Sequence, residues 1–223
     1  KTTVKIRKRL IKSYLMGAHQ QLNKEKNLEE AKKMFFKVLT EATALQDNYN
    51  IGVASCSLAK LHLRMARSCP VDEKKDILSA ALRFARNFKE MANKTKNLEN
   101  KSYAHKVIAD VITEQGDIKG AYSEFLKSLK AAEDAESTRS LQKARAAIGE
   151  AELRNERFEE AVKHLEIAFE LAKEMDDAGL IDRARISLGT AKGKKMLSSY
   201  MHGIQGDDLE KVFAWKGFRN NKF

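Results

Sequence analysis

Apolar residues recur along this chain at the spacing of one helix face. From Phe158 to Ala172 and from Ile118 to Leu129, apolar side chains return every three or four residues, with polar residues between them. This spacing is typical of amphipathic α-helices that bury one stripe. The pattern predicts ten helices, spanning residues 3–22, 28–46, 50–67, 73–95, 98–115, 118–135, 138–155, 158–176, 179–203 and 207–215.

The helical pattern repeats at a nearly fixed interval. Residues 144–151, Ala-Arg-Ala-Ala-Ile-Gly-Glu-Ala, recur 40 positions later as residues 184–191, Ala-Arg-Ile-Ser-Leu-Gly-Thr-Ala, and weaker copies begin at Ala104 and Ala54. A second series of alanines lies near the starts of other helices, at Ala31, Ala81, Ala121 and Ala161, with spacings of 50, 40 and 40 residues. Two series with the same spacing indicate a repeated unit of two helices. Such units must stack on each other, because a single helix pair cannot bury its apolar stripe.

Short polar joints separate the predicted helices. In the joint Gln115-Gly116-Asp117, we expect Gly116 to take the left-handed conformation that ends a helix and Asp117 to cap the next helix. We expect the small residues Gly149 and Gly189 to let paired helices approach closely. The second pair carries ten extra residues around 68–77, where we expect Pro70 to stop one helix and Asp72 to cap the next. This insertion is interpreted as either a long loop or a contact element.

The repeat resembles the tetratricopeptide repeat (TPR) family in the order of its residues, namely a small residue, a Gly-Asp turn, an alanine and then an aromatic residue or leucine. The usual TPR has about 34 residues, so the helices of this chain are longer. HEAT-type repeats have a similar period but lack this order. The resemblance implies an all-α fold, a right-handed α-solenoid of about five helix pairs. We expect the solenoid to span residues 1–203, and residues 204–223 to form a capping helix and tail in which Leu209, Val212 and Trp215 close the last apolar face.

The composition supports a helical, folded chain. Hydrophobic residues make up 43% of the 223 residues and charged residues 33%, with one proline and 11 glycines, which argues against a β-sandwich and against disorder. No apolar run is long enough to span a membrane, and the basic start does not resemble a signal peptide. The chain begins without methionine, so we expect it to be a piece of a longer protein. The two cysteines, Cys56 and Cys69, favour a reducing compartment.

The sequence contains none of the common catalytic motifs. A phosphate-binding loop, a nucleophile elbow, an H-E-x-x-H helix and a C-x-x-C pair are all missing, and the five histidines are scattered over different helices. We therefore expect neither catalysis, nor a small-molecule substrate, nor a cofactor, nor a bound metal.

The net charge of +11 is unevenly distributed. Residues 1–113 carry 23 basic and 11 acidic side chains, residues 114–185 carry 12 and 17, and residues 186–223 carry 7 and 3. A basic arm near the start comprises Lys5, Arg7, Lys8, Arg9 and Lys12. Such a charge indicates an acidic protein or nucleic acid as partner, or simply a solvated helix. No aromatic residues alternate with these basic residues as a single-strand nucleic-acid groove requires, so an acidic protein surface is favoured.

Proteins of the TPR family bind peptides along a concave face lined by the first helix of each pair. By repeat register, the resemblance implies partner-binding candidates at Lys60, Arg64, Tyr103, Lys106, Asp110, Lys143, Glu150 and Arg183. Repeats that clamp a free C-terminal carboxylate carry an asparagine at positions occupied here by Ser57, Val107, Ala147 and Ser187. Recognition of a free C-terminal carboxylate is therefore not expected.

Two stretches and the tail resemble one branch of the family. Residues 103–117 and 181–196, together with the Leu-x-x-Val-x-x-Trp-Lys ending at 209–216, are similar to the axonemal and flagellar family of tetratricopeptide repeat protein twenty-nine. This implies a scaffold in the cilium or flagellum axoneme, bound to dynein-associated or doublet-microtubule proteins. A Tonsoku-like nuclear scaffold of replication-coupled DNA repair, which has a similar tail, is the main alternative. An LGN-like polarity adaptor is weakened by the missing asparagines.

Overall fold

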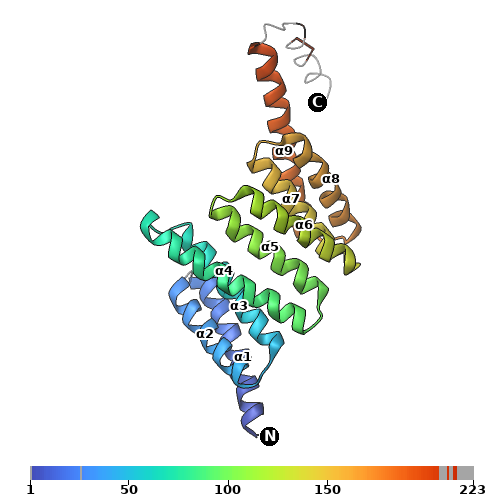
Figure 1. The fold of residues 1–223 in the computed structure, drawn as a ribbon. Coiled ribbons are helices and arrows are strands. Elements are labelled where there is room, and N and C mark those ends of the chain that lie inside the picture. Colours follow the sequence, from blue (N-terminus) through green and yellow to red (C-terminus); the bar gives the residue numbers. More distant parts are fainter. Residues whose placement is uncertain (1, 26, 206–209, 211–212, 215–223) are drawn as a thin grey trace. The chain divides into compact units, whose positions relative to one another are not determined.

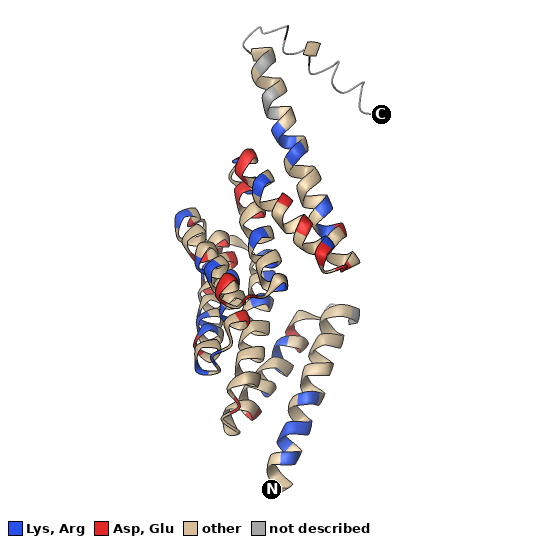
Figure 2. Ribbon diagram, turned by 90° about the vertical axis from the view of Figure 1, so that its right-hand side faces the viewer, with Lys and Arg blue, Asp and Glu red and all other residues tan. Residues whose placement is uncertain are grey.

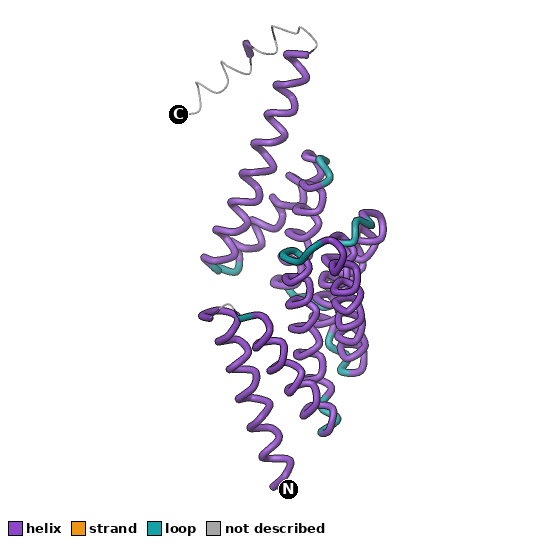
Figure 3. Tube along the Cα trace, turned by 90° about the vertical axis from the view of Figure 1, so that its left-hand side faces the viewer, coloured by secondary structure: helices purple, strands orange, loops and turns teal. Residues whose placement is uncertain are grey.

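The described part of the chain consists of helices and the short joints between them. A computed structural model describes residues 2–25, 27–205, 210 and 213–214, and no strand occurs among them (Figures 1 and 3). The helices are α1 (Thr2–Gln20), the short π-helix η1 (Gln21–Glu25), α2 (Leu28–Ala44), α3 (Asn48–Ala66), α4 (Val71–Lys94), α5 (Leu98–Glu114), α6 (Ile118–Asp134), α7 (Thr138–Arg154), α8 (Phe158–Glu174) and α9 (Ala178–Gln205).

Nine of the ten predicted helices are confirmed, and each end lies within two residues of its prediction. The tenth falls on residues 207–215, which lie outside the described residues except at 210, 213 and 214. The contacts divide the chain into two compact units, residues 1–140 and 141–223. The first unit contains the three helix pairs α1/α2, α3/α4 and α5/α6. The second contains α7 from residue 141, α8 and α9.

Most joints are built on one residue in the left-handed conformation. These residues are Gln46, Lys96, Gly116, Glu136, Glu156 and Asp176, so from residue 96 onward they follow each other every 20 positions. The next residue often serves two helices at once. Asp117 donates its N–H to Ile112 O (3.2 Å) at the end of α5, and its Oδ1 accepts the N–H of Gly120 (2.9 Å) at the start of α6. The predicted roles of Gly116, with a φ of 89°, and of Asp117 are confirmed.

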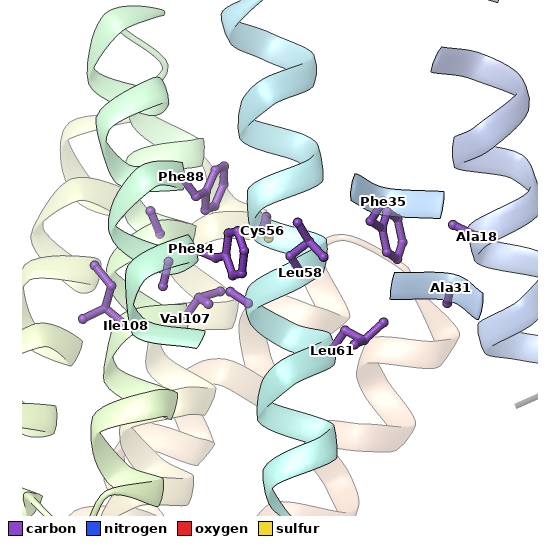
Figure 4. Packing of buried hydrophobic residues seen from close by; sticks show 13 residues of the cluster. Ala18, Ala31, Phe35, Cys56, Leu58, Leu61, Phe84, Phe88, Val107 and Ile108 are labelled. Atoms are coloured by element: carbon purple, nitrogen blue, oxygen red, sulfur yellow. The ribbon is translucent and has the colours of Figure 1, made fainter. Parts of the chain in front are cut away.

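The core of the first unit is a layer of aromatic and aliphatic side chains set between alanines. Figure 4 shows Phe35 of α2, Leu58 of α3 and Phe84 of α4 within this cluster, which extends to Val107 of α5. Phe35 and Leu58 are fully buried, and Ala31 and Ala59, also fully buried, belong to the same cluster. The small alanines between the large side chains let neighbouring helices approach each other closely here.

Polar pairs at equivalent positions link the two helices of successive pairs. His105 Nδ1 of α5 lies 2.7 Å from Glu124 Oε2 of α6, and Arg145 Nη1 of α7 lies 3.4 Å from His164 Nδ1 of α8. Arg145 lies 40 residues after His105, and His164 lies 40 residues after Glu124, so the two contacts occupy equivalent positions of the repeat. Burial would raise the pKa of Glu124, but hydrogen bonds from Lys127 and His105 outweigh it and hold the pKa below its usual value. These contacts favour one helix register over its neighbours.

Most of the insertion around 68–77 is helical, because residues 71–77 belong to α4 and only residues 68–70 lie in the joint after α3, so the interpretation as a long loop is wrong. α4 begins at Val71, directly after Pro70, which occupies the N-cap position without a side-chain hydrogen bond; Asp72 lies in the first turn instead of capping the helix. Proline is compatible with a helix start because its fixed φ and missing N–H disturb no helical bond there. The added turn is tied to α5: Glu114 accepts hydrogen bonds from Lys74 Nζ (2.8 Å) and Arg67 Nε (3.1 Å).

The two repeat-equivalent glycines lie in different surroundings. A Cβ atom placed on Gly149 of α7 would lie 2.6 Å from Leu165 Cγ of α8, so the predicted close approach is confirmed there. At Gly189 of α9, no atom lies within 4 Å of such a Cβ, and the same holds for Gly193. The expectation of a close helix contact at Gly189 is therefore wrong for the described residues.

We predict that Gly149→Ala destabilises the protein and that Gly189→Ala stabilises it. Overpacking against Leu165 costs about 1–3 kcal/mol, which outweighs the gain in helix propensity of up to about 1 kcal/mol that alanine brings at both positions. The denaturation midpoint measured by circular dichroism should fall for the first variant and rise for the second. Equal shifts of one sign would contradict this packing.

Candidate protein-interaction surface

Five of the predicted partner-binding residues lie together on α3 and α5. We call Lys60, Arg64, Tyr103, Lys106 and Asp110 the α3–α5 surface. The two helices are the first members of neighbouring pairs and contact each other directly. Lys60 and Arg64 are exposed one turn apart on α3, whereas the other three are half-buried on α5.

Tyr103 connects the two helices of this surface. Its ring packs edge-on against Phe88 of α4, with centroids 6.2 Å apart, and the Nζ of Lys60 lies 5.8 Å from its centroid. Partial burial would lower the pKa of Lys60, but the interactions with Tyr103 outweigh it and raise the pKa. Lys60 is thus positively charged and held over an aromatic ring that is itself held by packing.

The remaining charges of the surface are only partly neutralised. Lys106 Nζ lies 2.5 Å from Asp110 Oδ2, one turn further along α5, so this pair contributes no net charge. Arg64 has no ion pair with any other described residue. The α3–α5 surface therefore offers one free guanidinium, one lysine on an aromatic ring and one internal ion pair. This combination suits a carboxylate-bearing polypeptide more than a neutral one.

Cys56 lies beneath this surface and is chemically quiet. Its side chain is 9% exposed within the core of the first unit. Burial raises the pKa of its thiol to about 11, although the charges of Lys60 and Lys106 act in the opposite direction. The thiolate that would be needed for nucleophilic or metal chemistry is therefore scarce near neutral pH.

The other three candidates lie in the second unit. Lys143 and Arg183 are exposed on α7 and α9, and Glu150 is half-buried on α7. Glu150 Oε1 accepts a hydrogen bond from Ser187 Oγ of α9 (3.3 Å). The structure therefore places Glu150 in a contact between the first helices of two successive repeats. Its role in binding a partner remains a prediction, as for the seven other candidates.

The basic arm forms the first turns of α1, where Figure 2 shows a series of basic residues. Lys5, Lys8, Arg9 and Lys12 are exposed, whereas Arg7 donates to Glu41 Oε2 of α2 (2.9 Å). Arg7 thus contributes to the packing of α1 on α2, and the accessible charge of the arm resides in the other four side chains. The predicted capping residues Leu209, Val212 and Trp215 lie outside the described residues.

Sequence reasoning missed the residues that hold the insertion in place. Glu114 is paired with Lys74 and Arg67, and the hydrogen bond from Lys74 is the main cause that lowers its pKa. No repeat signal points to this cluster, because Lys74 belongs to the insertion. In contrast, the repeat spacing of 40 residues relates His105 to Arg145 and Glu124 to His164, so these two polar contacts could have been found from the sequence.

Within the described residues, no group of three or more His, Cys, Asp or Glu side chains is arranged to hold a metal ion. Among the same residues, none of the helices is long and apolar enough to cross a bilayer.

Comparison with known proteins identifies the fold. No protein-family model matches the chain, and no curated protein matches it by sequence. Similar solved structures include RapI in its apo form, BtubC (BKLC) from P. vanneervenii and a variant of the nearly identical TPR-like repeats of a Podosopora anserina kinesin light chain.

The three alignments cover 96%, 100% and 97% of this chain and 77%, 92% and 98% of the other chains, respectively. The TM-score is 0.60 in each case, and the sequence identities are 14%, 13% and 14%. At this identity the likeness concerns the fold alone. The chain is an all-α protein of the TPR-like repeat solenoid class.

We predict that the two cysteines differ strongly in reactivity. Cys69 is half-buried after the end of α3, whereas Cys56 is buried with a raised thiol pKa. Iodoacetamide at neutral pH should therefore modify Cys69 first, and Cys56 only when denaturant unfolds the chain. Peptide mass spectrometry over time measures both rates, and a Cys69→Ser variant isolates the slow thiol. Fast alkylation of Cys56 in the folded variant would contradict the burial.

Proposed function

We propose that this chain is a non-catalytic protein-interaction scaffold of the cilium or flagellum axoneme, where it holds dynein-associated or microtubule-bound proteins and is needed for motility. The observation that carries the scaffold proposal is the α3–α5 surface. Lys60 and Arg64 are exposed on this surface, and Lys60, Tyr103, Lys106 and Asp110 are held by contacts on two helices of a TPR-like fold. A prepositioned surface loses less side-chain entropy when a partner binds.

The axonemal assignment is supported by the resemblance of residues 103–117, 181–196 and 209–216 to the family of tetratricopeptide repeat protein twenty-nine. Two of these stretches lie on described helices. The first covers most of α5, including Tyr103, Lys106 and Asp110, and the second covers much of α9. The first stretch thus includes three of the five residues of the α3–α5 surface.

The charge of the first unit supports an acidic protein partner. Lys5, Lys8, Arg9 and Lys12 project from α1 into solvent, and Arg64 is exposed on α3. Exposed basic groups of this kind attract an acidic surface over a distance of about 10 Å at moderate salt. None of these groups is interleaved with stacked aromatic rings, which a single-stranded nucleic acid would require.

We predict that charge reversal on α3 removes the partner. In the full chain, Lys60→Glu with Arg64→Glu replaces two accessible cations by anions, and partner affinity should fall by at least about tenfold. Crosslinking mass spectrometry in the native assembly, compared between wild type and variant, measures the loss of crosslinks.

The matched control is Lys75→Glu with Arg86→Glu, which reverses one exposed lysine and one exposed arginine on α4. This control changes the net charge by the same amount at a different site and should keep the crosslinks. Equal loss in both variants would show that only bulk charge matters, and unchanged crosslinks in the α3 variant would reject this surface.

We predict that the protein localises along axonemes. Fluorescence imaging of the full-length tagged protein in ciliated cells should show a signal along cilia or flagella that survives detergent extraction of the membrane. A signal confined to nuclei would overturn the axonemal proposal and favour the Tonsoku-like role in DNA repair. A signal confined to the cell cortex would favour the LGN-like adaptor.

A further inference from the structure

Two polar contacts at equivalent positions of successive helix pairs each contain one histidine. His105 Nδ1 of α5 lies 2.7 Å from Glu124 Oε2 of α6, and His164 Nδ1 of α8 lies 3.4 Å from Arg145 Nη1 of α7. The first histidine thus faces a carboxylate, and the second faces a guanidinium. Because these partners carry opposite charges, the two contacts must respond differently when the histidine is protonated.

The contact with Arg145 requires a neutral histidine. A guanidinium has only N–H donors and keeps its charge, so the ring nitrogen of His164 that faces it must be the acceptor of the hydrogen bond. Nδ1 therefore carries no proton in this contact. A proton added to Nδ1 removes the acceptor and leaves two positive charges next to each other.

The packing around His164 strengthens this repulsion. The side chains of His164 and Arg145 are half-buried, and Arg145 Nε is buried, so water screens their charges only partly. The two helices also lie close together here, because a Cβ atom on Gly149 would lie 2.6 Å from the Cγ of Leu165, the residue after His164. Relief of the repulsion therefore requires that a side chain leaves the contact or that the helices separate.

The other charged groups near His164 do not reverse this effect. Glu152 of α7 is fully buried and is paired with Arg157, and Glu160 of α8 is paired with Lys163 (2.8 Å). Burial of His164 and the guanidinium it faces lower its pKa, and Lys163 acts in the same direction. The two carboxylates raise the pKa, but by less, so it remains below its usual value.

The charges of the helix on the other side of α8 are engaged elsewhere. Lys192 Nζ of α9 lies 2.8 Å from Glu166 Oε1, and Lys195 Nζ lies 3.4 Å from Glu159 Oε1. Both carboxylates belong to α8. The lysines of α9 therefore pair with other side chains of α8 than His164.

The lowered pKa of His164 sets the pH range of the effect. In an unfolded chain a histidine takes up its proton at about pH 6.5. Because the pKa is lower in the folded protein, the unfolded form binds more protons as the pH falls through this range. The stability that the contact provides is thus present above about pH 6.5 and is lost below it.

The equivalent contact between α5 and α6 is retained on protonation. A carboxylate only accepts hydrogen bonds, so His105 Nδ1 donates to Glu124 whether the ring is neutral or charged. A charged ring makes this hydrogen bond stronger. Although burial opposes it, hydrogen bonds from Lys127 and His105 hold the pKa of Glu124 below its usual value, so Glu124 stays ionised where His164 is protonated.

We propose that the contact of α7 with α8 is acid-sensitive: protonation of His164 breaks its hydrogen bond with Arg145 and loosens the two helices, while the equivalent contact of α5 with α6 is retained. Lys143 and Glu150, two of the partner-binding candidates, lie on α7, so mild acid would disturb their positions. The proposal does not depend on the proposed function, because the contact is present whether or not a partner binds.

Hydrogen exchange of the full chain, followed by mass spectrometry, measures the loosening helix by helix. We expect the protection of peptides from α7 and α8, corrected for the intrinsic pH dependence of exchange, to fall severalfold between about pH 7.5 and about pH 5.5. His164→Asn places a neutral acceptor near the position of Nδ1 and cannot be protonated, so its protection should change little. The matched control His202→Asn removes an exposed histidine of α9 and should keep the fall seen in the wild type.

The comparison is made between variants because the first unit has an acid response of its own. His62 of α3 is buried, and burial lowers its pKa. All the variants retain His62, so its contribution to the exchange of α7 and α8 is the same in each of them.

A second variant tests the opposite response of the two contacts. Arg145→His with His164→Glu places the residue types of the α5/α6 contact at the equivalent positions of α7 and α8. The protection of α7 and α8 in this variant should not fall on acidification. Circular dichroism at neutral pH verifies that it folds; if it does not, the comparison of the wild type with His164→Asn decides alone.

Three results would overturn the proposal. The first is unchanged protection of α7 and α8 when the wild-type chain is acidified. The second is an equal fall in the wild type and in His164→Asn, because another group would then be titrating. The third is a fall of wild-type size in the folded double variant, because the partner of the histidine would then have no influence.

Discussion

The structure depends on a joint in which one left-handed residue is followed by a residue that serves two helices. In the joint after α2, Asp47 donates its N–H to Ala42 O (3.0 Å), and its side chain accepts the N–H of Asn50 (3.1 Å). The joint therefore satisfies the end of one helix and the start of the next within three residues. Because the joint is so short, α2 and α3 must lie side by side and antiparallel.

Helix length and side-chain register follow from the spacing of these joints. Because the left-handed residues lie 20 positions apart, each of α5 to α8 has 17 residues. Alanines and large apolar residues therefore occupy equivalent positions along each of these helices. The joints are not conformationally free of cost, since a non-glycine residue in the left-handed region is disfavoured by about 1 kcal/mol. The hydrogen bonds of the joint and the packing of helices such as α5 on α6 offset this cost.

The sequence predicted the helices well because the joints and the apolar periodicity are both local signals. It failed at the insertion because Pro70 was interpreted only as the stop of the preceding helix, whereas proline is equally compatible with a helix start and here occupies the N-cap position of α4. The prediction failed at Gly189 because a glycine shows only that a neighbouring helix could pack closely against it. The sequence does not show whether such a helix is present there.

The candidate surface was predicted less completely than the fold. Repeat register placed Lys60 and Tyr103 on the first helices of their pairs, but their mutual contact required the packing of α3 on α5. The engagement of Arg7 with Glu41 was equally invisible, because the two residues are 34 positions apart without any repeat relation. Counting charges along the sequence therefore overestimates what a partner can reach.

The accessible charge is instead set by which ion pairs the packing forms. Arg7, Lys74 and Lys106 each have a carboxylate partner within 2.9 Å, so their charges are largely neutralised inside the first unit. On the α3–α5 surface and the basic arm, Lys60, Arg64 and the four exposed residues of the arm are the cations that remain for recognition. Because they stand on helices whose register the joints fix, their spacing is set before any partner arrives. Specificity for a partner would then reside in the positions of a few cations, and the net charge of +11 would mainly affect the rate of encounter.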